Sequence, residues 1–223
     1  MTFLRWLLPW LAIPAFSQEA LRYTINYASG LSLGEASLIA SKTKVEGEER
    51  WGVQFELDAS VPGFAVVDRF QSVATGAWCS IELQKATKHG RRVGEEKTAF
   101  DGKSGQATRE TKDGGKSKIT IPRCAKDALA YVMFLRQQLV TGKVPPPETV
   151  FFGAEYRVRT EFKGTQNVTV AEKATPAERL MVTVKGPASE YTVEMFFAKD
   201  ATRTPVLVRV PLKVGTLTME LAR

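Results

Sequence analysis

Apolar and polar residues alternate along most of this chain with the two-residue period of a β-strand. The stretch LRYTINYA (21–28), for example, places Leu21, Tyr23, Ile25 and Tyr27 on one side. This pattern is typical of a strand with one buried face. Comparable runs, punctuated by turn signals, cover 31–45, 50–59, 65–74, 78–88, 97–102, 104–112, 116–121, 149–162, 167–174, 178–186, 190–200, 204–214 and 215–223. We therefore expect a mainly β protein with an antiparallel, barrel-like or strongly curved sheet.

The segment KDALAYVMFLRQQL (126–139) interrupts this alternation with a helical pattern. Its apolar residues cover nearly the whole circumference, which indicates a helix buried on more than one side. We predict a helix at about 125–141, with Asp127 in its first turn and Gly142 ending it. In a β protein, such a helix packs in or across the concave face of the sheet, or plugs one end of a barrel.

Arg136 lies on the apolar side of this predicted helix and shares a face with Leu129. A buried guanidinium requires a carboxylate or carbonyl partner. We expect that partner to come from the sheet, and the candidates are Asp68, Asp101 and Asp200.

The first residues have the features of a secretory signal peptide. A basic start with Arg5 precedes the apolar run LLPWLAIPAF (7–16), and small residues stand at the −3 and −1 positions before Gln18. We predict a signal peptide over residues 1–17 and a single β-rich domain over 18–223, in a periplasmic or secreted protein. The alternative is an uncleaved anchor, although the run is shorter than the roughly 20 residues of a membrane span. No later segment is long and apolar enough to cross a bilayer.

The chain contains two cysteines, Cys79 and Cys124. In an oxidising compartment, two cysteines most simply form one disulfide. This one would close a loop of about 45 residues and stabilise the fold by roughly 4 kcal/mol. The alternatives are a reactive thiol or a metal ligand, but the chain has no Cys-x-x-Cys, and a tetrahedral zinc site needs further His or Cys ligands. We predict the disulfide, and no metal or cofactor.

The formal net charge is +7 at pH 7. Basic clusters occur in KATKHGRR (85–92) and KDGGKSK (112–118), within a very polar stretch (85–118) that we expect to form an exposed sheet or projecting hairpin layer. No aromatic residue is interleaved with them, so we expect no nucleic-acid partner. A modestly basic surface suits an anionic partner such as lipid headgroups or polyanionic glycans. Solvated hairpins are the simpler interpretation.

Motifs of the common enzyme classes are lacking. The single histidine, His89, lies in a basic, glycine-flanked turn. This excludes a site built on two histidines and disfavours a Ser-His-Asp triad. The sequence has no G-x-S-x-G, no Walker loop and no G-x-G-x-x-G. A glycosidase-type carboxylate pair leaves no sequence signature, because the fold sets its separation. We therefore do not predict an enzyme, and a carboxylate-dependent glycan hydrolase stays open as an alternative.

Several stretches in order resemble the bacterial domain-of-unknown-function 3108 family of exported proteins. They are LRYTINYASGLSLGEASL (21–38), DRFQS (68–72), CAKDALAYVMFLRQQL (124–139), AKDATRTPVLVRV (198–210) and GTLTMEL (215–221). The helix departs from the Asp-Pro-Leu-Ser start usual in that family by having Ala128 and Ala130, which indicates a structural role there. The resemblance implies an antiparallel, barrel-like β fold in the periplasm and no established activity. By analogy, we place the fold near the half-barrels of lipoprotein carriers, in which a curved sheet wraps helices around an apolar cavity.

These features together predict a non-enzymatic binder or carrier of a hydrophobic or amphiphilic ligand, such as a small molecule or lipid, in the cell envelope. A concave apolar sheet covered by one helix provides the setting for such a site. The residues predicted to contact the ligand are Tyr131, Phe134 and Arg136 on the helix, and Asp68 and Arg203 at the rim. The alternative is a packed scaffold or interaction domain for another envelope protein. An apolar space of several hundred Å³ would favour the binder.

Overall fold

The computed structural model describes residues 18–27, 29–45, 47–61, 63–212 and 215–222. The predicted signal peptide, residues 1–17, lies outside this part of the chain. The first half forms strands β1 (Gln18–Tyr27), β2 (Ser32–Val45), β3 (Glu48–Val61), β4 (Phe64–Thr75), β5 (Ser80–His89), β6 (Arg92–Asp101), β7 (Gln106–Thr111) and β8 (Lys116–Thr120). The second half forms β9 (Lys126–Asp127), α1 (Ala128–Val140), β10 (Glu148–Phe151), β11 (Glu155–Val170), β12 (Lys173–Lys185), β13 (Glu190–Ala198), β14 (Pro205–Leu212) and β15 (Gly215–Leu221).

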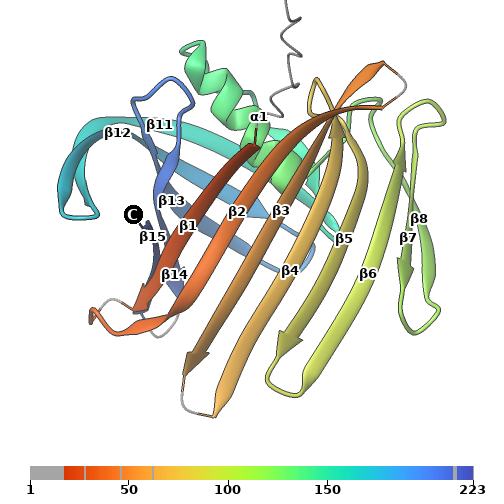
Figure 1. The fold of residues 1–223 in the computed structure, drawn as a ribbon. Helices are drawn as coiled ribbons and strands as arrows, with labels where there is room; N and C mark the ends of the chain where they lie inside the picture. The colour runs from red at the N-terminus through yellow and green to blue at the C-terminus, as the bar shows by residue number, and fades with distance from the viewer. Residues whose placement is uncertain (1–17, 28, 46, 62, 213–214, 223) are drawn as a thin grey trace, which may run out of the picture.

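All of these strands belong to one sheet, in the order β8-β7-β6-β5-β4-β3-β2-β1-β15-β14-β13-β12-β11-β10-β9. Neighbouring strands are antiparallel except β9 and β10, which run parallel because α1 connects them. The first and last strands meet in the middle of the sheet, where Tyr23 of β1 stands opposite Leu221 of β15. The two halves of the chain therefore form two walls that share a central seam (Figure 1).

The sheet curls until its β9 side reaches β5. The amide of Ser80 donates a hydrogen bond to the carbonyl of Ala125 at 2.8 Å, which ties the start of β5 to the segment before β9. The strands β6 to β8 continue past this contact and end in the free edge of β8. This part coincides with the polar stretch 85–118 that the sequence predicts to be exposed or projecting. The sheet is thus barrel-like and strongly curved but not closed, as the alternation predicts.

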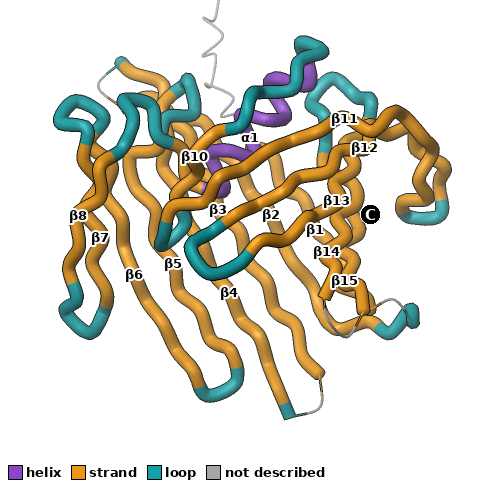
Figure 2. Tube along the Cα trace, turned by 180° about the vertical axis from the view of Figure 1, so that it is seen from behind, coloured by secondary structure: helices purple, strands orange, loops and turns teal. Residues whose placement is uncertain are grey.

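Helix α1 lies inside the curve. Figures 1 and 2, which view the molecule from opposite sides, both place it between the wall of β1 to β6 and the wall of β10 to β13. Its buried residues surround its axis, and they are Leu129, Ala130, Tyr131, Met133, Leu135, Arg136 and Leu139. The prediction of an apolar helix packed in the concave face is confirmed.

The helix is shorter at its start than the predicted range of about 125–141. Asp127 is its N-cap, with extended backbone (φ −79°, ψ 175°), because Lys126 and Asp127 form β9 and pair with β10. The C-terminus is a Schellman motif, in which Lys143 N donates to Gln138 O and Gly142 N donates to Leu139 O. Gly142 has φ +70°, which is favourable only for glycine. No helix of the described residues is long and apolar enough to cross a membrane.

Candidate functional site

The N-terminus of α1 is fixed to the sheet through Asp127, a side chain with no solvent exposure. One carboxylate oxygen accepts hydrogen bonds from the amides of Leu129 (2.9 Å) and Ala130 (3.0 Å), which caps the helix. The other accepts from the hydroxyls of Ser72 and Ser80, both at 2.6 Å. Burial raises the pKa of this carboxyl, and the hydrogen bonds that it accepts act in the opposite direction. Asp127 therefore joins the helix to β4 and β5.

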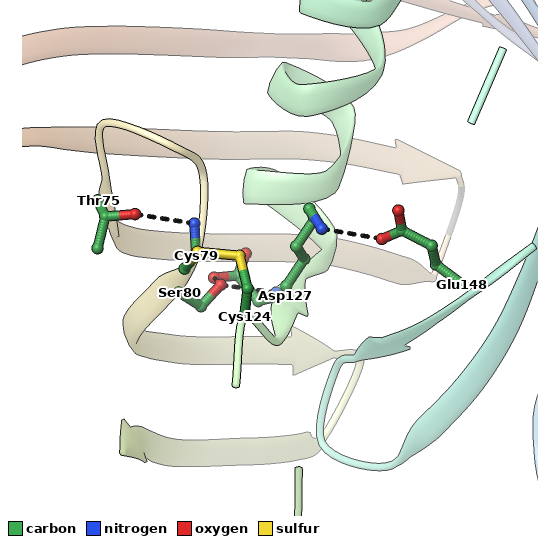
Figure 3. Close-up of a disulfide and its surroundings, with 7 residues drawn as sticks. Thr75, Cys79, Ser80, Cys124, Asp127 and Glu148 are labelled. Atoms are coloured by element: carbon green, nitrogen blue, oxygen red, sulfur yellow. Dashed lines mark hydrogen bonds and ion pairs between the residues drawn. A yellow bond between two sulfur atoms is a disulfide. The ribbon is translucent and has the colours of Figure 1, made fainter. Parts of the chain in front are cut away.

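A disulfide supports the same end of the helix, as Figure 3 shows. Cys79, just before β5, is bonded to Cys124, just before β9, with their Cα atoms 4.7 Å apart. The predicted pairing is thus present in the structure. Beside it, the ammonium group of Lys126 lies 3.0 Å from the Glu148 carboxylate and 4.3 Å from the ring centroid of Phe134. These contacts hold the α1 start against both walls.

The C-terminal half of α1 is fixed through Arg136, which is 4% exposed. Its Nη1 and Nη2 donate to the two carboxylate oxygens of Glu19 at 2.6 and 2.8 Å, and its Nε donates to the carbonyls of Thr202 and Arg203. The prediction that the buried guanidinium takes carboxylate or carbonyl partners, with the carboxylate from the sheet, is confirmed. The predicted identities were wrong, because Asp68, Asp101 and Asp200 do not contact the guanidinium.

The two walls and the helix line an apolar cavity of about 360 Å³ that is partly open to solvent. Helix α1 contributes one side of the cavity through Tyr131, Leu135 and their neighbours. The walls contribute inward-facing aliphatic and aromatic side chains, which include Leu38, Phe55, Phe70, Val158, Val182, Val184, Val193, Met195, Val208 and Met219. Among the described residues that line the cavity, none carries a charged side chain. The volume lies in the range of small-molecule sites in proteins, roughly 300–1,000 Å³.

Tyrosines line this cavity with their rings, while the structure pairs two of their hydroxyls in the walls. The Tyr23 hydroxyl donates to the carbonyl of Pro205 at 2.9 Å, and the Tyr131 hydroxyl lies 3.0 Å from the Thr160 hydroxyl. Burial raises the pKa of both phenols, so they stay neutral and protonated. The cavity therefore presents an uncharged surface, which favours an apolar ligand over an ionic one.

One margin of the cavity borders a charged network on the concave face of β5 to β7. Lys85 Nζ lies 2.8 Å from Glu96 and 4.1 Å from the ring centroid of Phe152, a residue of the cavity lining. Arg109 donates to the other oxygen of Glu96 through Nε at 2.7 Å and through Nη2. Burial raises the pKa of Glu96, but its bonds to Lys85 and Arg109 outweigh this and hold the pKa below its ordinary value. Two cations therefore share one carboxylate beside the apolar space.

The five predicted ligand contacts fall in different places. Tyr131 lines the cavity. Phe134 packs between the core clusters on either side of α1, and Arg136 borders a second, more polar groove. Asp68 is 2.8 Å from His89, and Arg203 is 3.2 Å from Glu178, so both are paired away from the cavity lining. Of the five predicted contact residues, only Tyr131 therefore lines the cavity.

Most of the cavity lining comes from strands that the sequence reasoning did not single out. Phe55 and Phe70, for example, stand opposite each other on β3 and β4 with ring centroids 6.0 Å apart. Their alternation marks them as inward-facing, but it marks packed core residues in the same way. Only the three-dimensional curvature separates the inward positions that pack from those that leave space.

The second groove, of about 540 Å³, lies over the C-terminal half of α1. Trp51 and Trp78 stack there with ring centroids 4.9 Å apart, and Lys42 lies 5.7 Å from the centroid of the Trp51 ring. The groove also borders the carboxylates of Glu19 and Glu49, which pair with Arg136 and Lys42. Within the described ranges, no group of three or more His, Cys, Asp or Glu side chains is placed to hold a metal ion.

Comparisons with other proteins give a family model and a solved structure. The model, described as a protein of unknown function (DUF3108), matches residues 22–222. A crystal structure of a β-barrel-like protein of the domain of unknown function DUF1849 from Brucella abortus is similar with a TM-score of 0.64 at 6% identity. That similarity covers 92% of this chain and 95% of the other, and at this identity it shows the fold alone. No curated protein matches the sequence.

Proposed function

This chain belongs to the DUF3108 family of proteins of unknown function, and on that premise we propose that it binds or carries a hydrophobic or amphiphilic ligand in the cell envelope. The observation that carries the proposal is the cavity of about 360 Å³ with an uncharged, mainly apolar and aromatic lining. A ligand that fills such a space releases water from apolar surface, at roughly 25 cal/mol per Å² buried.

The volume and apolar lining of the cavity suit part of a long acyl chain or a compact apolar molecule. This partly open space is many times the volume of a water molecule, and its described lining is uncharged and mainly apolar. The cavity therefore supports a binder over the alternative of a packed scaffold for envelope proteins.

The charged network beside Phe152 supports an amphiphile with a polar end. Lys85 and Arg109 share Glu96 at the margin of the apolar lining. A polar or anionic headgroup at this margin would meet two cations, while its apolar part would occupy the cavity. The proposed export to the periplasm or outside the cell, which rests on the signal-peptide pattern of residues 1–17, would place the protein where such envelope molecules occur.

A glycan hydrolase is the less well supported alternative. Such an enzyme needs two carboxyl groups that face one cleft at roughly 5–10 Å. The described residues of the cavity lining include no carboxylate. The two carboxylates that border the second groove, Glu19 and Glu49, are each ion-paired.

A fluorescent long-chain fatty-acid analogue tests the proposal. Its emission rises when it enters an apolar cavity, and unlabelled ligands that share the site displace it. We expect saturable binding of about one probe per chain, with displacement by fatty acids or lysophospholipids. Binding no stronger than that of an unrelated β protein would support the packed scaffold instead.

A further inference from the structure

We propose that the hairpin end of the barrel opposite α1 docks on a lipid surface rich in anionic headgroups. The surface, called here the turn rim, consists of exposed apolar side chains in, or at the strand ends beside, four adjacent hairpin turns: Leu31, Val61, Phe64, Val93 and Leu212. The inference rests on the proposed function, because docking there would present the cavity to a membrane that contains its ligand.

The turn rim holds half of the described large apolar side chains that are exposed. Leu31 is 59% exposed, Phe64 48% and Val93 64%. Isolated exposed apolar residues are ordinary on protein surfaces, but a group at one end of a molecule marks an interaction site.

The sheet topology places these turns together. In the antiparallel meander of β1 to β6, the turns after β1, β3 and β5 fall at one end, and Figure 1 shows them at the lower end of the wall, away from α1. The turn between β14 and β15 joins them, because Leu217 of β15 stands opposite Tyr27 at the end of β1. The ring of Phe64 lies directly over Gly90 of the next turn, where an added Cβ would come within 3.0 Å of it.

The charges of the same turns are of one sign. Arg91 and Arg92 are exposed in the turn between β5 and β6, and neither forms an ion pair with a described residue. The described residues of the four turns include no acidic side chain. The next turn, between β7 and β8, adds Lys112 and Asp113, one charge of each sign. Exposed apolar side chains flanked by arginines fit an anionic bilayer. The apolar side chains would enter the membrane–water interface, and the guanidinium groups would contact lipid phosphates.

Inward-facing positions of β3 and β4 connect the turn rim with the cavity. Phe55 and Phe70 line the cavity, and the inward positions further along β3 are the half-buried Leu57 and Ala59. On β4 the inward positions are Asp68, which lies opposite Leu57 and pairs with His89 at 2.8 Å, and then the half-buried Val66. Val61 and Phe64 are the next residues in the same inward series. Since α1 occupies the opposite end, the apolar side chains of β3 mark the route by which a chain could pass between a bilayer and the cavity.

Co-sedimentation of the protein with vesicles tests the docking. One set of vesicles contains phosphatidylglycerol and phosphatidylcholine in equal parts, and the other contains phosphatidylcholine alone. We expect binding to the anionic vesicles that weakens as salt is added, and little binding to the neutral ones. Equal binding to both kinds of vesicle, or no binding to either, would overturn the proposal. If the protein binds neither kind of vesicle and forms a dimer in analytical ultracentrifugation, the turn rim would be assigned to contact with a second copy of the chain.

Matched variants locate the contact. The pair Arg91→Ser and Arg92→Ser should weaken binding to anionic vesicles by roughly 30-fold, at about 1 kcal/mol for each basic residue. The pair Lys103→Ser and Arg123→Ser removes the same charge at the other end of the sheet, near the turn between β6 and β7, and should leave binding within about twofold. Equal losses in both pairs would show a diffuse effect of net charge and contradict a local site.

The apolar contribution has its own pair of variants. Val61→Ser combined with Phe64→Ser should lower vesicle binding at least as strongly as the arginine pair. Phe162→Ser removes a 50% exposed aromatic from within β11 and should not lower it. Each variant is also titrated with the fatty-acid probe. A variant that still binds the probe but no longer docks on vesicles has lost only the turn-rim contact. If the wild-type protein docks on vesicles but does not bind the probe, the proposed ligand site in the cavity is wrong, and the docking proposal still stands.

Discussion

The guanidinium of Arg136 and the carboxylate of Glu19 form a two-point hydrogen-bonded ion pair, with N–O distances of 2.6 and 2.8 Å, that joins α1 to the first residues of β1. Asp127 and the neighbouring disulfide fix the other end of the helix to β4 and β5. The helix is therefore held at both ends by polar or covalent contacts, while its middle faces an apolar space. These contacts specify the position of α1 beside the cavity, because leaving any of these buried polar groups unpaired is costly.

Removal of the Glu19 carboxylate should destabilise the fold. Glu19→Ala leaves the buried guanidinium of Arg136 with carbonyl partners only, and we expect a loss of about 3 kcal/mol in the free energy of unfolding. Urea denaturation measures this loss. Glu35→Ala, at an exposed position of β2 without an ion-pair partner among the described residues, is the matched control and should change stability by less than about 0.5 kcal/mol. Similar small effects of both changes would contradict the anchoring role.

The disulfide should be present in protein isolated without reductant. Mass spectrometry of a non-reduced digest is expected to show one peptide pair linked through Cys79 and Cys124. The double variant Cys79→Ser, Cys124→Ser should lose roughly 4 kcal/mol of stability, the value for closing a loop of about 45 residues. Two alkylatable thiols in the native protein would refute the prediction.

The network around Glu96 should make stability depend on pH. The pKa of Glu96 is depressed in the folded state from its ordinary value of 4.5. Its stabilising contribution is therefore fully present above that value and is lost as the pH falls through the lower, folded-state pKa. Glu96→Gln should consequently narrow the difference in stability between pH 7 and acid conditions below pH 4.5. Denaturation curves of the two proteins that shift in parallel with pH would show that Glu96 contributes nothing to acid sensitivity.

A substitution that fills the cavity should abolish ligand binding without unfolding the protein. Val193→Trp places a larger side chain in the lining, and we expect the affinity for the fatty-acid probe to fall by at least about tenfold, the equivalent of 1.4 kcal/mol. Val73→Trp makes the same change on the outer face of β4, where the valine is 39% exposed, and should leave probe affinity unchanged. If both variants bind the probe like the original chain, the probe occupies another site.

The sequence predicts the architecture better than the site. Alternation predicts which side of each strand faces inward, and the all-round apolar pattern of 126–139 predicts a helix inside the curve. The disulfide follows from the cysteine count, since only one pairing is available to Cys79 and Cys124. These features depend on local pattern, so they are readable without the fold.

The partner of Arg136 and the lining of the cavity are not local. Glu19 is 117 positions away from Arg136 and follows directly on the predicted signal peptide, so sequence reasoning did not consider it among the candidate partners. Asp68 and Arg203 were predicted at a binding rim from their charge, but His89 and Glu178 pair with them. Whether an inward-facing residue is fully packed or borders the cavity depends on how strongly the sheet curves. Neither the periodicity nor the composition of the sequence encodes this curvature.

Native mass spectrometry of the protein isolated gently from the cells that make it, followed by organic extraction, shows whether the cavity holds a ligand. We expect an added mass near one equivalent per chain, which extraction identifies as an apolar or amphiphilic molecule and which Val193→Trp lacks. A mass equal to that of the polypeptide alone, unchanged after incubation with long-chain fatty acids and lysophospholipids, would contradict the claim that the cavity is a ligand site.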